Sequence, residues 1–360
     1  MIQKRNYGLD LLKIISMLMV ILLHVTTYGI KNIQCTPLSL KWFDVSIIRS
    51  FCYVAVNCFV LISGYFMCQK KFKIDRLLKL WCSVIFYSVT VYIISIIVPS
   101  SGMTFSFKEL LKRFMPLMTS SYWFFNSYFV LMILSPFLNK LIQSMSKEEL
   151  KRTVIVLITI FAIIPTFDFF SDPFYSSYGY SFVWFVVLYM ISAYIRVSNF
   201  DIKNAGMVYF LCAGAEIIIN VIYQFPKNEH IRFFFVLQTY YNSIFVLLGA
   251  ISLFCFFRKL DIKNIKLTSA IKWVVPKSFA VYLIHEHPLF RDILWSKIIK
   301  MERFDSNAIT FLLAFIISTI VIFSISILIE ALREKFFNKV EKKVIDNIQL
   351  LINRINIING

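Results

Sequence analysis

Residues 9–28 read LDLLKIISMLMVILLHVTTY, and this stretch decides the fold class. It is long enough to cross the hydrocarbon core of a bilayer, which takes about 20 mostly apolar residues in a helix. Lys4 and Arg5 precede it, as in a secretory signal peptide, but no small-x-small cleavage site follows. We therefore expect an uncleaved first membrane span.

Nine later segments share this length and apolar character. They cover residues 45–67, 77–98, 122–141, 153–170, 180–197, 205–223, 233–257, 273–294 and 308–332. Of the 360 residues, 59% are hydrophobic and 16% are charged, against about half and about a quarter in soluble proteins. The sequence predicts an all-α, polytopic membrane protein of about ten transmembrane helices, and it argues against a soluble enzyme or a disordered chain.

The distribution of Lys and Arg predicts the orientation of these spans. With the N-terminus in the cytoplasm, the inner loops and termini hold 24 Lys and Arg residues and the outer loops hold 11. Since inner loops carry the basic excess, we expect both termini in the cytoplasm. We divide the chain into a transmembrane domain, 1–332, and a tail, 333–360.

The tail shows the pattern of an amphipathic helix. Its apolar residues fall on one stripe and its lysines on the other face, as in a helix that lies on a membrane surface. A partner-binding or simply packed helix is the alternative. The stripe consists of Phe337, Val340, Val344, Ile348, Leu351 and Ile355.

The net charge of +18 raises the question of nucleic-acid binding, but the basic residues lie between apolar runs, which indicates loops anchored at the cytoplasmic surface.

The seven cysteines form no CxxC pair and most lie inside apolar runs, so we expect buried thiols without a disulfide. We also expect no metal. His285 and His287 would project about 200° apart on a helix, whereas zinc needs convergent ligands.

Three ionisable residues of the first span share one helical face. Lys13 and His24 are eleven residues apart, which corresponds to three turns plus about 20°, and about 16 Å along the axis. Asp10 lies about 40° to the other side of His24 and can pair with Lys13. Because charged groups are costly in hydrocarbon, these three are candidates for function. Snorkelling of Lys13 and a hydrogen bond from His24 to another helix are the alternatives.

The second span ends in small residues and is followed by a basic run. Ser63 and Gly64 permit close approach of another helix. If the substrate carries phosphates, the segment becomes an anion site at the cytoplasmic mouth. We assign to that site Ser63, Gly64, Tyr65, Lys71, Lys73, Arg76 and Lys79.

Two further segments carry polar groups at membrane depth. The first runs from Tyr122 to Tyr128, where an interfacial aromatic belt explains the aromatic residues better than Asn126. The second, residues 281–288, interrupts the ninth span, and a broken helix lining a cavity would tolerate that. We take as candidates for a substrate pocket Trp123, Asn126, Tyr282, His285 and Glu286. Glu216 is a further buried carboxylate, which either pairs with a lysine such as Lys277 or lines a polar path.

Taken in order, these motifs resemble the acyltransferase 3 family of bacterial integral-membrane acyltransferases. Asp10, Lys13 and His24 match the acidic-basic-x10-His pattern of its first helix, although Arg is commoner at the basic position. The segment from Val60 to Tyr65, with the later Arg76-x-x-Lys79, is similar to its second motif. The tryptophan-led span from Trp123 to Pro136 and the segment Tyr282-Leu-Ile-His285 resemble two more. The resemblance covers residues 5–332.

The resemblance implies an acyl-CoA donor, usually acetyl-CoA, and an extracytoplasmic or lipid-linked carbohydrate acceptor. The implied location is a bacterial plasma membrane. In this interpretation His24 is the general base or a transient acyl carrier, with Lys13 and Asp10 orienting the donor. Three alternatives stay open: a transporter or flippase of a glycan precursor, a sensor or assembly subunit, and a succinyl or longer acyl donor.

Overall fold

The computed structural model describes residues 5–98, 103–119, 121–167, 172–225 and 240–358. These residues form helices joined by turns, with no strand among them. Eight helical segments are long and apolar enough to cross a membrane, and the apolar helix α9 (Phe182–Ser198) is slightly shorter. The all-α membrane fold is therefore confirmed, while the count of ten spans and the cytoplasmic placement of the termini stay predictions.

Within the described residues, each of the ten expected segments overlaps one or more helices. The first three are α1 (Tyr7–His24), continued by the π-helix η1 (Val25–Gly29); α2 (Leu40–Cys52) with α3 (Val54–Met67); and α4 (Ile74–Ile97). The next are α6 (Trp123–Ser144), α7 (Lys147–Ile158) with η3 (Thr159–Ile163) and α8 (Ile164–Phe167), and α9. They are followed by α10 (Ala205–Ile222) and α12 (Ile244–Lys259). Of the expected spans 153–170 and 233–257, residues 168–170 and 233–239 lie outside the described part.

The ninth expected span is interrupted, as its polar residues predict. Where the sequence predicts a span over 273–294, the structure has a candidate span at Ile265–His285, which begins and ends earlier. It consists of α13 (Ile265–Val274), a short 3₁₀ turn at Val275–Lys277 that contains Pro276, and α14 (Ser278–His285). Proline at this position removes a backbone donor and breaks the regular helix. Three short helices follow: α15 (Pro288–Ile293), η6 (Leu294–Ile299) and η7 (Met301–Phe304).

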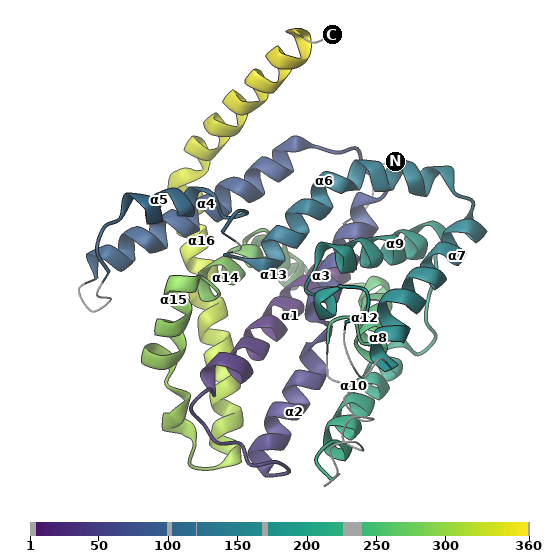
Figure 1. The fold of residues 1–360 in the computed structure, drawn as a ribbon, viewed down its shortest axis with the longest axis vertical. Coiled ribbons are helices and arrows are strands. Elements are labelled where there is room, and N and C mark those ends of the chain that lie inside the picture. Colours follow the sequence, from purple (N-terminus) through teal and green to yellow (C-terminus); the bar gives the residue numbers. More distant parts are fainter. Residues whose placement is uncertain (1–4, 99–102, 120, 168–171, 226–239, 359–360) are drawn as a thin grey trace.

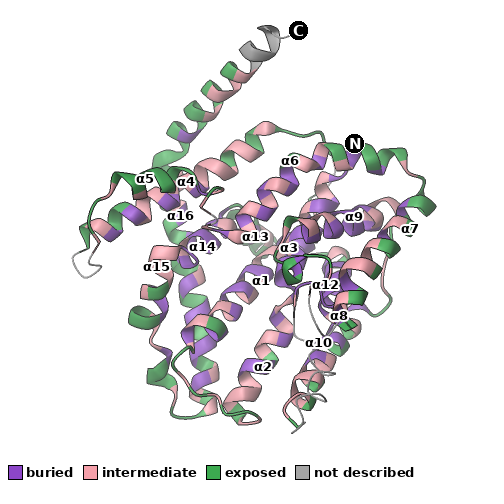
Figure 2. Ribbon diagram, viewed as in Figure 1, coloured by how far each residue is buried: buried purple, intermediate pink, exposed green. Residues whose placement is uncertain are grey.

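Helix α1 crosses the middle of the bundle and contacts α2, α3, α12, α14 and α16 (Figure 1). Its N-terminus approaches α12 so closely that a Cβ at position 8 would clash with the Phe257 carbonyl oxygen, and the approach therefore requires Gly8. Buried residues concentrate on α1, α3, α9 and α12 (Figure 2). This central position surrounds the polar face of α1 with other helices rather than with lipid.

The last helix, α16 (Ala308–Ile358), runs without a break through the expected boundary at 332/333. At about 1.5 Å per residue its 51 residues span about 76 Å. Its C-terminal part projects beyond the rest of the molecule (Figure 1). The predicted tail is therefore a helical continuation of the last span, and its placement on a membrane surface stays a prediction.

Candidate active site

One face of α1 lines a cavity of about 350 Å³. Asn6 caps the helix, since its side chain accepts a hydrogen bond from the Leu9 amide. From there Lys13, Met17, Val20 and His24 recur at helical spacing along the cavity wall. Side chains from α3, α4, α6, α14 and α16 form other parts of the cavity wall. The structure thus places the lysine and the histidine in the same cavity.

The end of this cavity near Lys13 is cationic. Arg76 and Lys79, from the first turns of α4, also line it. Within the described part of the chain, no carboxylate lies within ion-pair distance of these three cations. A second cavity of about 510 Å³ adjoins the first and adds Arg5 and Lys70. Unpaired cations on a cavity wall favour binding of an anionic group.

Asp10 lines the second cavity, and its carboxylate accepts a hydrogen bond of 2.5 Å from Arg5 Nε. Among the described residues Asp10 thus forms an ion pair with Arg5, and none within 4.0 Å joins it to Lys13. Because Asp10 bonds to Arg5, Lys13 has no carboxylate within ion-pair distance among the described residues.

The residues assigned to the donor site from the sequence divide into two groups. Ser63 and Arg76 line both cavities and Lys79 lines the first. Lys71 and Lys73 are exposed and line neither cavity.

Gly64 and Tyr65 instead face α9. A Cβ at Gly64 would lie 2.1 Å from Ser192 Oγ, so the glycine permits close packing of α3 on α9. The Tyr65 hydroxyl accepts a hydrogen bond of 2.8 Å from Arg196 Nη1. Both residues serve helix packing in this structure.

At the other end of the cavity, His24 belongs to a chain of hydrogen bonds. His285 Nδ1 lies 2.5 Å from the Val281 carbonyl oxygen, which can only accept, so this nitrogen carries the proton. His285 Nε2 is then an acceptor, and His24 Nδ1, 2.8 Å away, donates to it. His24 Nε2 is left with a free lone pair. Neutral His285 therefore fixes the His24 tautomer that a general base needs.

Glu286 completes this cluster. Its Oε1 lies 3.3 Å from His24 Nδ1 and its Oε2 lies 3.6 Å from Arg291 Nη1. Glu286 directly follows the span that ends at His285, and burial raises the pKa of its carboxyl to about 7, an effect that the Arg291 guanidinium opposes. The carboxylate is close enough to stabilise a positive charge on His24.

The same three residues bring ligand atoms within 4.8 Å of one another, an arrangement that a metal ion could use. The prediction of no metal considered only His285 and His287, which project apart on one helix. It did not consider His24, which comes from the first helix. However, His24 Nδ1 and His285 Nε2 are only 2.8 Å apart. Two nitrogens on one tetrahedral zinc, each about 2.0–2.1 Å from it, would stand roughly 3.3 Å apart. The observed distance is that of a hydrogen bond.

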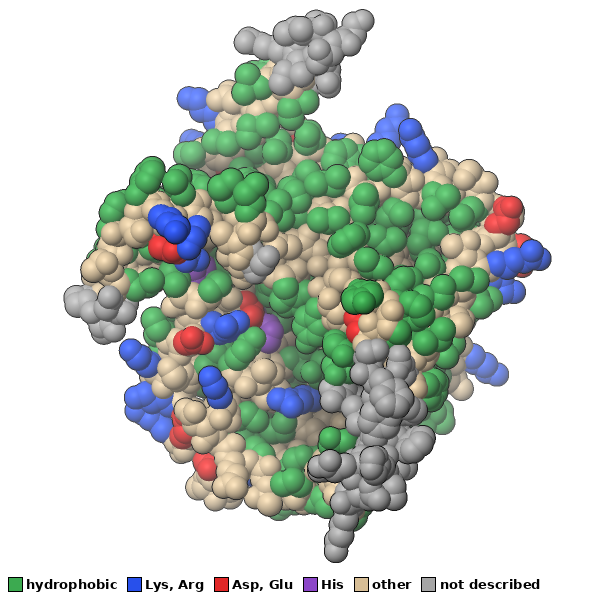
Figure 3. All heavy atoms as spheres, viewed as in Figure 1, with side chains coloured by type: hydrophobic (Ala, Val, Ile, Leu, Met, Phe, Trp, Pro, Cys, Tyr) green, Lys and Arg blue, Asp and Glu red, His purple; other side chains and the backbone are tan. Residues whose placement is uncertain are grey.

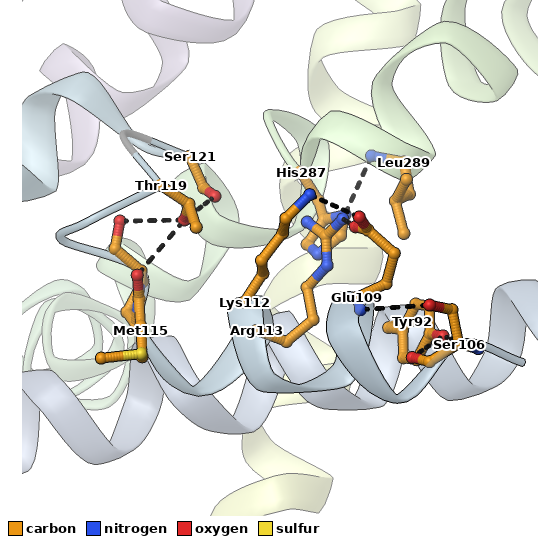
Figure 4. Close-up of polar contacts among 11 residues, drawn as sticks. Tyr92, Ser106, Glu109, Lys112, Arg113, Met115, Thr119, Ser121, His287 and Leu289 are labelled. Atoms are coloured by element: carbon orange, nitrogen blue, oxygen red, sulfur yellow. Dashed lines mark hydrogen bonds and ion pairs between the residues drawn. The ribbon is translucent and has the colours of Figure 1, made fainter.

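His287 has a different environment. Its Nδ1 accepts a hydrogen bond from the Leu289 amide and so caps α15, close to Arg113 of helix α5 (Phe107–Phe114), which pairs with Glu109 (Figure 4). Burial, together with the charge of Arg113, lowers the pKa of His287 to about 3. His287 is thus a neutral capping residue and lines neither of the two cavities.

The aromatic candidates also fall in the cavity wall. Trp123 and Tyr282 line it, whereas Asn126 donates to the Leu117 carbonyl oxygen at 3.3 Å and lines neither cavity. His285 and Glu286 act on the cavity through His24 and are not part of its wall.

Three residues of α16 line the cavity although no sequence motif predicts them: Glu330, Arg333 and Glu334. Arg333 is buried and bonds to Glu330 and Glu341, while Lys277 lies 3.0 Å from Glu334. The i, i+3 spacing of Glu330 and Arg333 is the signal that could have indicated this pairing.

Glu216 accepts a hydrogen bond from Ser243 Oγ. Lys277, which the sequence suggests as a partner for Glu216, forms its ion pair with Glu334 instead.

The fold and site define a polytopic helical membrane protein whose cavity joins a cationic end to a half-buried imidazole. A family model described as an acyltransferase domain matches residues 6–331, nearly the whole chain. The chain therefore belongs to the acyltransferase 3 family and is a membrane acyltransferase. No match was found among curated proteins or solved structures.

Proposed function

We propose that this protein transfers an acyl group, in the first place acetyl, from acyl-CoA to a hydroxyl of a carbohydrate at the surface of a bacterial plasma membrane. The observation that carries the proposal is the single cavity with Lys13 at one end and His24 at the other. The two residues are about 16 Å apart along α1, a distance suited to a long, thin pantetheine arm.

The cations support a phosphate-bearing donor. Lys13, Arg76 and Lys79 line the cavity without carboxylate partners among the described residues, and Arg5 and Lys70 extend the positive charge into the adjoining cavity. Phosphate oxygens form strong, charge-assisted hydrogen bonds with such groups. With the phosphates held there, the thioester would point along the cavity towards His24.

In the transfer step, His24 Nε2 removes the proton of the acceptor hydroxyl as its oxygen attacks the thioester carbonyl carbon. A carbon–oxygen bond forms and the carbon–sulfur bond breaks. The CoA sulfur leaves as a thiolate and takes up the proton from His24, so the products are an ester and free CoA. Glu286 would stabilise the imidazolium formed in between. We prefer this direct route to one through an acyl-histidine because it needs a single transfer step. The acceptor oxygen is the nucleophile, and the lone pair of His24 Nε2 acts only as the base.

The test is acyl transfer in purified membranes that contain His24→Gln or the wild type, with radiolabelled acetyl-CoA and the envelope glycan fraction of cells that lack the gene. We expect the rate to fall by roughly 10²–10⁴-fold, the usual contribution of a general base. His287→Asn is the matched control, since asparagine can also cap α15. An undiminished rate in correctly inserted His24→Gln protein would refute the role of His24, and transport of a glycan without CoA would favour a transporter.

A further inference from the structure

A group of polar side chains encloses His24 on the side remote from Lys13. Tyr28, one turn further along the chain in η1, has its ring centroid 5.7 Å from that of His24. The Arg291 guanidinium of α15 lies 4.5 Å from the Tyr28 ring, and its Nη1 donates to the Tyr28 hydroxyl at 3.3 Å. Together with Glu286, these residues form what we term the outer polar cluster: Tyr28, Glu286 and Arg291.

Two buried atoms of this cluster have unmet hydrogen-bonding capacity. Neither Glu286 Oε1 nor Arg291 Nε has a hydrogen-bond partner within the described residues. Oε1 is 3.3 Å from His24 Nδ1, but that nitrogen donates to His285. Leaving a buried polar group without a hydrogen-bond partner is unfavourable, so such groups indicate a bound ligand or water. Here one atom is an acceptor and the other a donor.

The surroundings favour a ligand that comes from outside. Glu286 is 6% exposed, whereas the Arg291 side chain is 31% exposed and its neighbour Asp292 is 86% exposed. The cluster therefore extends from the neighbourhood of His24 to partly exposed side chains at the surface. In the space-filling view, a histidine lies beside acidic and basic side chains near the middle of the face shown (Figure 3).

We propose that Arg291 and Glu286 form the subsite for the acceptor and bind a pair of neighbouring sugar hydroxyls. Arg291 donates to one hydroxyl oxygen and Glu286 accepts from the next hydroxyl, so the two side chains hold the sugar beside the His24 imidazole and leave another of its hydroxyls to react at Nε2. The two side chains carry opposite charges, which suits a neutral polyhydroxyl ligand, whereas a phosphate group would favour the cations around Lys13. Donor and acceptor would thus reach His24 from opposite ends. This inference rests on the proposed function and names its acceptor site.

The first experiment measures initial rates with the full-length Arg291→Gln protein. Acetyl-CoA and the glycan fraction from cells that lack the gene are varied separately. We expect the apparent KM for the glycan fraction to rise about tenfold or more, as for one lost hydrogen bond to a charged group, and that for acetyl-CoA to stay within about twofold. Arg291→Lys should recover part of the loss. Arg303→Gln, an exposed arginine in η7, is the matched control.

A second measurement does not depend on the donor. The same glycan fraction, without CoA, should raise the Tm of the wild-type protein in detergent, because a ligand of the native state stabilises it. Arg291→Gln should lose that shift. Wild-type or equally raised KM values for both substrates, or an unchanged Tm shift in Arg291→Gln, would overturn the subsite. A wild-type protein that is stabilised by glycan but does not use acetyl-CoA would contradict the proposed function alone.

Discussion

His24 acquires its role from neighbours that are far away in the sequence. His285, Glu286 and Arg291 come from the segment after Pro276, and they fix the tautomer and the charge environment of an imidazole on the first helix. The carboxyl of Glu286 is the titrating group of this cluster outside the spans, with its pKa raised by burial to about 7. Its charge therefore changes in the physiological range.

The pH dependence of transfer should reflect Glu286. Below a pH of about 7 its carboxyl is mostly protonated, and above that it is a carboxylate that stabilises the His24 imidazolium. We expect kcat to rise with pH through this range in the wild type and to be lower, without this rise, in Glu286→Gln. Identical profiles of the two proteins, measured at saturating substrates, would show that another group controls the rate.

Lys13 can be tested against the alternative that it merely snorkels to the membrane surface. Lys13→Ala removes a charge-assisted hydrogen bond of about 1.5–3 kcal/mol, so the KM for acetyl-CoA should rise roughly 10–100-fold. Lys13→Arg should keep most of the affinity. Lys71→Ala, at an exposed position away from both cavities, is the control and should leave the KM unchanged. Equal effects of the two alanine variants would contradict a specific role of Lys13.

At the scale of elements, close helix packing holds the cavity walls in place. Helix α3 carries Ser63 on the cavity side and Gly64 against α9. A one-residue step on a helix rotates the side chain by about 100°, so neighbouring residues of one motif serve different purposes. This is why Ser-Gly-Tyr divides between the cavity and the packing interface.

Gly64→Ala should therefore act on stability. The added Cβ would meet Ser192 Oγ at 2.1 Å and Tyr189 Cα at 3.2 Å, and overpacking of this kind costs about 1–3 kcal/mol. We expect a lower Tm in detergent, with partial recovery in Gly64→Ala/Ser192→Gly. Gly214→Ala, where a Cβ meets nothing within 4 Å, should not lower the Tm. If Gly64→Ala instead lowered the affinity for acetyl-CoA and left the Tm unchanged, Gly64 would belong to the donor site as the sequence predicts.

At the scale of the whole molecule, the direction of transfer depends on the orientation in the membrane. The basic end of the cavity and the N-terminus lie together, since Arg5 and Lys13 line the same cavity. The excess of Lys and Arg in alternate loops predicts that this end faces the cytoplasm, where CoA is available. His24 and the outer polar cluster would then lie towards the outer surface.

Single-cysteine labelling can test this orientation. In a variant without the seven native cysteines, we expect Lys151→Cys at the exposed start of α7 to react with an impermeant maleimide only after cells are opened. Lys297→Cys, at an exposed position in η6, should react in intact cells. The reverse pattern would invert the topology and require the donor to bind from outside.

The sequence by itself determined the class of fold, the helices and the shared face of Lys13 and His24. Hydrophobic length and a helical period of about 3.6 residues are local properties that need no partner. Arg76 and Lys79 could likewise be found from their position after the second span.

Only the tertiary structure decided what these side chains contact. It brought His285 and Glu286 close to His24, paired Asp10 with Arg5, and placed Arg333 of α16 in the cavity wall. Such pairings depend on how α1, α14 and α16 pack against each other in three dimensions. Spacing along one chain cannot specify them, because hydrogen bonds and ion pairs form between atoms a few ångströms apart whatever their separation in sequence.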